Sequence, residues 1–435
     1  MAAVTTPCER RPGKEPDPPG ELAAWAASGA MWLTGRPGSP ALGPPAGLVA
    51  KLRLVADAID RQTAAMGARV EVDPLALLGE RAAIAGLRRQ GTTSCGGATR
   101  LVRTADRWLA VTLARIDDVE LVPAWLEIDH PIDDVWGAVA SVAAAGPADR
   151  LLERALLLGL PAAVLPAAPP PPPGASARQA PTRPADALPR RAVRVPGPPV
   201  APAASLAGLL VVDLSALWAG PLCGALLAEA GADVVKVEST GRPDGARRGP
   251  GAFFDLLNAG KRSVALDLGS TEGRGRLHDL LARADVVIEA SRPRALADLG
   301  VDAASLVAGG GPRVWLSITG HGRHGPGRDR VGFGDDAAVA GGLVSRDDRG
   351  PCFCADAVAD PTTGLVAAAA VLDVLAAGGR WLLDVGMSAV AAHLAGPTLP
   401  VSDPAPTPAR PRARPRRGRA PRLGEHTAAV LAIRS

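Results

Sequence analysis

The sequence predicts an α/β protein that combines a doubly wound parallel sheet domain with a smaller α+β domain. Between residues 204 and 400, short continuous apolar runs alternate with helical segments, as they do around a buried parallel sheet. Residues 21–165 are richer in helical patterns and contain one pair of strands. A proline-rich segment follows each of these units, so we expect two folding units joined by linkers.

The central unit, residues 204–400, alternates strands with helices in sequence order. One helix, GPLCGALLAEAGA, ends at Gly231, and another, STEGRGRLHDLLARA, begins at Ser270, a favoured N-cap residue. This alternation predicts right-handed crossovers, with ligands at the carboxyl ends of the strands. The predicted strands are GLLVVDLS, DVVKVE, RSVALDL, DVVIEA and RVWLSITG.

The N-terminal unit, residues 21–165, predicts a helix, then a strand pair, then a second helix and a short strand. The strand pair turns at Ala105 and Asp106. Residues 26–50 resemble residues 338–367, because both open with glycines and close on Gly-Leu-Val-Ala, but the earlier copy has no acidic residue near its end. The three predicted segments are AGLVAKLRLVADAIDRQTAAMGA, RLVRTADRWLAVTLA and PADRLLERALLLGLPAAVL.

Proline-rich composition predicts two segments that cannot pack, residues 166–203 and residues 401–419. Proline removes backbone donors and favours extended conformations, so both are expected to be linkers. Residues 1–20 are polar and proline-rich, which predicts a disordered N-terminus and not a signal peptide. Residues 420–435 form a short C-terminal piece.

Charge and composition argue against several classes of partner. The net charge is only +4, and much of the basic excess lies in ARPRARPRRGRAPR, where prolines predict a solvated linker instead of a nucleic-acid surface. No apolar run reaches about 20 residues, so we expect no membrane span, and GLVAAAAVLDVLAA predicts a buried core helix. The five cysteines form no disulfide framework, which favours a reducing, cytoplasmic setting.

A glycine pattern at Gly320–Gly325, GHGRHG, follows a predicted strand and matches the dinucleotide fingerprint literally. That fingerprint must open a helix whose N-terminus meets the pyrophosphate. Pro326 and a loop-like run follow here instead, so we expect no nicotinamide dinucleotide site.

Two histidines and two cysteines raise the question of a metal site. His321 and His324 precede Cys352 and Cys354, but structural zinc sites use pairs of C-x₂₋₄-C type spacing. Buried cysteines are common packing residues, so we expect these two to pack in the core and no metal to bind.

The stretch GPCFCADAVADPTTGL holds two aspartates before an apolar helix. Asp360 suits the N-cap position, with Pro361 at the first helical position. A carboxylate at a helix N-terminus beside a glycine-rich loop also suits a nucleophile. Local chemistry leaves both interpretations of Asp360 open, whereas Asp356 is expected to be structural.

Six blocks of the chain, in order and with natural spacing, resemble the family III (CaiB/BaiF) CoA-transferases, which include α-methylacyl-CoA racemases. The resemblance covers about residues 205–395, and residues 420–432 resemble the family's C-terminal segment. The N-terminal unit resembles the family's later small-domain part, so the order of parts is rearranged, as in a fusion or a circular permutation. The blocks are LLVVDLSALWAGPLCGALLAEAGADVVKVE, FFDLLNAGKRSVALDL, TEGRGRLHDLLARADVVIEASRP, LGV, WLSITGHGRHGP and ADPTTGL.

The resemblance implies a Rossmann-like large domain, a homodimer and CoA-transferase activity of the EC 2.8.3 type, with coenzyme A thioesters as substrates and no permanently bound cofactor. It implies that Asp360 is the nucleophile, which forms an acyl anhydride and then an aspartyl-CoA thioester before CoA passes to an acceptor carboxylate. Basic side chains among the implied CoA contacts would meet its phosphates. These contacts are Leu217, Trp218, Ala219, Gly220, Pro221, Asn258, Lys261, Arg262 and Arg292.

The chain also departs from the family pattern. Where many members carry Asn-Phe-Arg-Pro, residues 290–293 read Ala-Ser-Arg-Pro. Racemases carry a His-Asp pair where this chain has Phe333 and no histidine, which disfavours proton exchange at an α-carbon. Two alternatives stay open: an acyl-CoA racemase or isomerase, and a non-catalytic CoA-binding protein.

Overall fold

Seven strands form the main sheet in this computed structural model, which describes residues 20–167, 188–401 and 403–432. The predictions for residues 1–19, for the middle of the first linker and for the last three residues lie outside the described residues. The strand order is β4-β12-β9-β8-β5-β6-β7, and only the edge strand β4 runs antiparallel to its neighbour. The strands are β4 Arg191–Arg194, β5 Leu210–Asp213, β6 Asp233–Ser239, β7 Arg262–Leu266, β8 Val286–Glu289, β9 Val314–Thr319 and β12 Trp381–Gly386.

This order confirms the doubly wound α/β fold. From β5 the chain winds outward through β6 and β7, then returns beside β5 at β8 and winds the other way through β9 and β12. The carboxyl ends of β5 and β8 therefore flank the switch point, where ligands bind in such sheets. The strands β12 and β4 were not predicted, and β4 lies in the segment expected to be linker.

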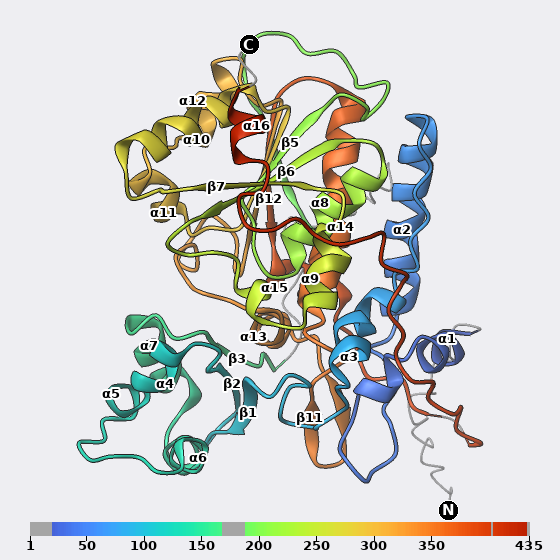
Figure 1. Ribbon diagram of the computed structural model, residues 1–435. Coiled ribbons are helices and arrows are strands. Elements are labelled where there is room, and N and C mark those ends of the chain that lie inside the picture. The colour runs from blue at the N-terminus through green and yellow to red at the C-terminus, as the bar shows by residue number, and fades with distance from the viewer. Residues whose placement is uncertain (1–19, 168–187, 402, 433–435) are drawn as a thin grey trace, which may run out of the picture.

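Helices cover both faces of the sheet (Figure 1). One face packs against α8, α14 and α2 through residues such as Val211, Ile288 and Leu316. The other packs against α10 and its neighbours through Val212 and Trp315. The helices are α8 Ala219–Glu229, α9 Gly251–Asn258, α10 Thr271–Arg283, α11 Pro293–Asp298, α12 Ala303–Ala308, α13 Gly334–Ala340, α14 Ala359–Ala377, α15 Met387–Leu394 and α16 Thr427–Ala432, with a short 3₁₀ turn at Gly245–Arg248.

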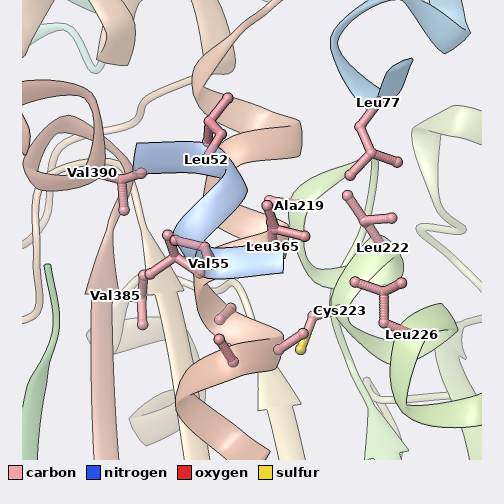
Figure 2. Packing of buried hydrophobic residues seen from close by; sticks show 14 of the residues in the cluster. Leu52, Val55, Leu77, Ala219, Leu222, Cys223, Leu226, Leu365, Val385 and Val390 are labelled. Atoms are coloured by element: carbon pink, nitrogen blue, oxygen red, sulfur yellow. The ribbon is translucent and has the colours of Figure 1, made fainter. Parts of the chain in front are cut away.

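The helix α14 is long and apolar enough to cross a membrane, with a mean hydropathy of 1.4, but 83% of it is buried inside the protein. It lies between α8 and α2, as predicted for a core helix (Figure 2). A Cβ at Gly364 would lie 2.6 Å from the Ala219 carbonyl oxygen, so glycine permits the close approach of α14 to α8. This contact sets the start of α14 beside the first βα turn.

The N-terminal unit divides into two parts. Its helices α1 to α3 pack on the large domain, and Leu52 and Val55 of α2 join the core around α14 (Figure 2). Residues 99–164 form a smaller α+β domain with a core of its own, and its β1–β2 hairpin confirms the predicted strand pair. Its elements are α1 Glu21–Ala27, α2 Leu48–Ala65, α3 Glu80–Ala85, β1 Thr99–Arg103, β2 Trp108–Thr112, α4 Ile116–Glu120, α5 Val122–Leu126, α6 Val135–Ala145, α7 Ala148–Leu157 and β3 Ala162–Val164; β10 Ser345–Asp347 and β11 Gly350–Cys352 form a second hairpin.

Residues 403–420, which we call the basic strap, cover most of the predicted linker 401–419 and form no helix or strand, but the expectation that this segment cannot pack was wrong. The strap lies along the molecule and joins the N-terminal helices to the large domain (Figure 1). Its arginines form ion pairs with carboxylates of the folded protein. Its prolines have no backbone N–H and therefore need no hydrogen-bond acceptor for it. The contacts are Arg414 with Glu80 at 3.3 Å, Arg416 with Asp255 at 3.4 Å, and Arg417 with Glu229 at 3.0 Å.

After the strap, the C-terminal segment covers the edge strand β7. The backbone N–H of His426 donates to the Ser263 carbonyl oxygen at 2.9 Å, and Thr427 Oγ1 accepts from the Ala265 N–H at 3.0 Å. These bonds satisfy backbone N–H and C=O groups of β7. On an uncovered edge strand, the same groups would be free to pair with another chain.

Candidate active site

A strained turn follows β5 at the switch point. Leu217 has φ +69°, a left-handed conformation that costs a non-glycine residue about 1–3 kcal/mol. Two interactions hold it: the Leu217 N–H donates to Asp244 Oδ1 at 3.0 Å, and Lys236 Nζ bridges the Ser215 carbonyl oxygen and Asp244 at 2.8 Å each. The Leu217 side chain is left 40% exposed at the carboxyl edge of the sheet.

The next residues of the predicted CoA site, Trp218 to Pro221, are buried where α8 begins. Trp218 packs edge to face on Phe253, with ring centroids 5.1 Å apart. A Cβ at Gly220 would collide with the Ser215 side chain, so only glycine fits the turn there. These four residues shape the turn, and Leu217 is the member of the group whose side chain is open to a ligand.

Lys261 lies beneath α8 with its ammonium group fully buried. It donates to Asp213 Oδ2 at 2.9 Å, to the Pro221 carbonyl oxygen at 2.8 Å and to Asn258 Oδ1 at 3.1 Å. An ammonium group has three N–H donors, so none is left for a phosphate. The position of Lys261 therefore differs from the phosphate contact that the resemblance implied.

Arg262 also lies away from the switch point. It begins β7 and pairs with Asp233, which begins β6, so the pair lies at the amino-terminal edge of the sheet. Asn258 is buried and donates to the Phe254 carbonyl oxygen at 3.1 Å. The structure does not bring Asn258, Lys261 and Arg262 together with Leu217 at the carboxyl edge.

Arg292 follows β8 and does lie at the carboxyl edge. Burial lowers its pKa, and the nearby charges of Arg294, Arg115 and Arg242 lower it further. These four residues form what we call the arginine group. Such a concentration of positive charge at a switch point is suited to phosphate groups. The other three members could not be predicted from the sequence, because they come from the small domain, the loop after β6 and the start of α11.

Asp360 lies in the first turn of α14, but it does not cap the helix. The helix begins at Ala359 with Val358 as its N-cap, and the Asp360 N–H donates to the Ala357 carbonyl oxygen at 2.8 Å. The cap prediction was therefore wrong, because the helix starts two residues earlier than the Asp-Pro pair indicates. Asp360 is partly exposed as a residue, and its carboxylate accepts no hydrogen bond from the described residues.

Backbone strain and close packing surround this carboxylate. Ala355 and Ala357, just before it, both have positive φ values of 55° and 44°. A Cβ at Gly334, where α13 begins, would collide with Asp360 Oδ2. Glycine at position 334 thus lets α13 lie directly against the Asp360 side chain.

Four carboxyl groups gather at this point: Asp335, Asp336, Asp356 and Asp360, which we call the acid cluster. Burial raises the pKa of Asp360 to about 7, with Arg81 opposing the shift and the three neighbouring carboxylates adding to it. Burial likewise raises the pKa of Asp335 to about 6 and that of Asp336 to about 7. Strongly perturbed carboxyl groups of this kind are frequent at catalytic sites.

Arg81, on α3, connects the acid cluster with the turn after β5. Its Nε and Nη2 atoms donate to Asp356 at 2.9 and 2.5 Å, and its guanidinium lies 5.3 Å from the centre of the Trp218 ring. Asp356 is thus structural, as expected. Sequence reasoning missed Arg81, because nothing near residue 81 indicates a contact with residues 218 and 356.

The other candidate motifs show no sign of the metal or dinucleotide chemistry considered for them. Cys352 and Cys354 are buried and free, and burial lowers the pKa of His321 to about 3. The loop Gly320–Gly325 does not open a helix, since α13 begins only at Gly334. Among residues 20–167, 188–401 and 403–432, no group of three or more His, Cys, Asp or Glu side chains is arranged so that it could hold a metal ion.

Comparison with known proteins identifies the family. The model of CoA-transferase family III matches residues 206–423, half of the chain. The chain belongs to this family. A solved CAIB/BAIF family protein from Brucella suis is 34% identical to this chain. The matched region covers 43% of this chain and 54% of the Brucella protein, with a TM-score of 0.39.

Curated relatives of this family III chain are named CoA-transferases. An acyl-CoA transferase of Fusarium pseudograminearum is 34% identical over 194 residues, 40% of this chain and 42% of the relative. A succinyl-CoA–D-citramalate CoA-transferase of Chloroflexus aurantiacus is 31% identical over 191 residues, 41% and 48% of the two chains. A succinate–glutarate CoA-transferase of Agrobacterium fabrum is 35% identical over 184 residues, 38% and 46%. The chain thus spans about half the length of these relatives.

The family III match includes Asp360, the turn after β5 and Arg292, but it excludes the N-terminal unit. Arg81 therefore lies outside the matched region, although its side chain contacts the acid cluster.

Proposed function

We propose that this chain transfers CoA from an acyl-CoA thioester to a carboxylic acid, with Asp360 as the nucleophile. The observation that carries the proposal is the carboxylate of a partly exposed residue, which accepts no hydrogen bond from the described residues and lies at the start of α14 against Gly334. A carboxylate free of hydrogen bonds keeps its lone pairs available for attack. Membership of family III supports the reaction class.

In the proposed reaction, the Asp360 carboxylate attacks the thioester carbonyl, and the C–S bond breaks to release CoA thiolate and leave an acyl-aspartyl anhydride. The thiolate then attacks the aspartyl carbonyl, which frees the donor acid and leaves an aspartyl-CoA thioester. The acceptor carboxylate attacks this thioester, and the released thiolate attacks the new anhydride at the acceptor carbonyl. Asp360 is regenerated, and no proton is gained or lost overall.

The carboxyl edge of the sheet is the proposed place for CoA. Leu217 would offer apolar surface, while Arg292 and the rest of the arginine group would meet the phosphates. The Arg81–Trp218 contact lies between this edge and Asp360. The homodimer and the cytoplasmic setting stay predictions.

A transfer assay tests the reaction class. We expect that incubation with a panel of acyl-CoA donors and isotopically labelled carboxylic acids will give labelled acyl-CoA in mass spectra, with ping-pong kinetics. Deuterium uptake at the α-carbon without an acceptor acid would instead indicate a racemase. CoA binding by calorimetry with no turnover for any pair would indicate a non-catalytic protein.

The rate is expected to depend on pH through the acid cluster. Only the ionised form of Asp360 is nucleophilic, and its raised pKa of about 7 means that ionisation is incomplete at neutral pH. We expect kcat to rise with pH, to be half-maximal near pH 7, and to fall about tenfold for each unit below that. Stopped assays between pH 5 and 9, with circular dichroism as a check of folding, measure this. A flat profile would contradict it.

A further inference from the structure

We infer that the N-terminal unit completes the active site, with Arg81 as a positioning residue that holds the acid cluster in place around Asp360. This inference rests on the proposed role of Asp360. It goes beyond that role because it assigns part of the site to a region outside the family match.

The first support is the geometry of the Arg81 side chain. Two parallel hydrogen bonds to Asp356 fix the plane of its guanidinium, and Asp356 itself is fully buried. A forked contact of this type gives orientation as well as energy. Asp356 lies between Ala355 and Ala357, the two strained residues, so Arg81 holds the turn that leads into Asp360.

The second support is that the other carboxyl groups are also held by the N-terminal unit. Thr112 Oγ1 of β2 donates to Asp336 Oδ1 at 3.0 Å, and the nearby Ser94 side chain lowers the pKa of Asp335. Both aspartates lie in the first turn of α13, next to Gly334. Three side chains of the N-terminal unit therefore act on three members of the acid cluster, and Asp360 is the member left without a hydrogen bond.

The third support is charge. The charged groups with the largest effects on Asp360 are Arg81 of α3, Asp335 and Asp336 of α13, and Asp356 of the preceding turn. Burial also raises the pKa of the nearby Cys95 thiol, which stays neutral. Among these charged groups, Arg81 is the cation with the largest effect on the pKa of Asp360. Removing a cation raises every macroscopic pKa of a coupled acidic group, so Asp360 would retain its proton to higher pH.

The experiment compares Arg81→Gln, Arg81→Lys and a control, Arg88→Gln, which removes an exposed arginine three residues after α3. For Arg81→Gln we expect the acidic limb of the kcat profile to move up by about one pH unit. This shift lowers kcat about fivefold at pH 7, with KM changed less than about twofold. Arg88→Gln should match the unchanged protein in both respects.

Arg81→Lys separates charge from geometry. Lysine keeps the positive charge but cannot make the forked contact with Asp356. We expect the acidic limb to stay in place while kcat falls, because the turn before Asp360 is held less firmly. This variant also carries the test if Arg81→Gln does not fold.

Three results would overturn the inference. The first is a lower Tm for Arg81→Gln with the acidic limb unmoved, which is the signature of a purely structural arginine. The second is an Arg81→Lys variant with the same kcat as the unchanged protein. The third is an Arg81→Lys variant in which the acidic limb of the kcat profile moves to a different pH. Asp360→Asn distinguishes this failure from failure of the proposed function: if it keeps full transfer activity, the nucleophile itself is misassigned, whatever Arg81 does.

Discussion

Replacing Asp360 with asparagine is expected to lower kcat for CoA transfer by at least about a thousandfold. The carboxamide has nearly the same size, so the packing against Gly334 is kept, but it cannot form the anhydride. Steady-state transfer assays measure the loss. Because Asp360 is partly exposed and makes no side-chain hydrogen bond with the described residues, Tm should change little.

Covalent trapping identifies the attacking atom directly. When the unchanged protein is incubated with an acyl-CoA donor and hydroxylamine, mass spectra should show a hydroxamate on Asp360. Asp279→Asn, an exposed aspartate of α10, is the matched control and should keep both the adduct and full activity. An active Asp360→Asn protein, or an adduct on another carboxylate, would remove Asp360 from the mechanism.

Replacing Lys261 with methionine is expected to destabilise the protein by about 3–5 kcal/mol. The change leaves Asp213 fully buried without its closest cation and also removes the bonds to Pro221 and Asn258. Burial opposes ionisation of Asp213, but the charges of Lys261 and Lys236 keep its pKa low, so it stays ionised at neutral pH. Urea unfolding followed by circular dichroism measures the change.

Two control variants are needed to interpret the result for Lys261→Met. Lys51→Met removes a lysine whose ammonium donates to the His393 carbonyl oxygen, and should cost only about 1 kcal/mol. The double change Lys261→Met with Asp213→Asn removes the uncompensated charge and should recover part of the loss. An unchanged unfolding free energy together with a tenfold rise in KM for the acyl-CoA would instead show that Lys261 contacts phosphate.

The parts that the sequence predicts well depend on local patterns. The strands of the large domain follow from apolar runs, and Ser270 follows from a local cap, which accepts from the Gly273 N–H at 2.9 Å. Asp360 was singled out by the order of six blocks and not by its own neighbours. Locally it was indistinguishable from a helix cap, but the helix begins two residues earlier than a cap at Asp360 would place it.

The parts that the sequence did not predict depend on distant partners. The strand β4 forms only because β12 offers an edge, and the arginines of the basic strap are ordered by carboxylates far away in the chain. Arg81 and Asp356 are separated by 275 residues. A pattern of residues near position 81 carries no information on such a contact, because the three-dimensional fold creates it.

The basic strap also affects the order in which parts of the protein can fold during translation. Glu80 is fully buried, and its partner Arg414 is made 334 residues later. At about 5–20 residues per second, the ribosome needs roughly 20 to 70 seconds to cover that distance. Until then Glu80 lacks Arg414, so we expect α3, and Arg81 with it, to reach a stable position only after the strap emerges.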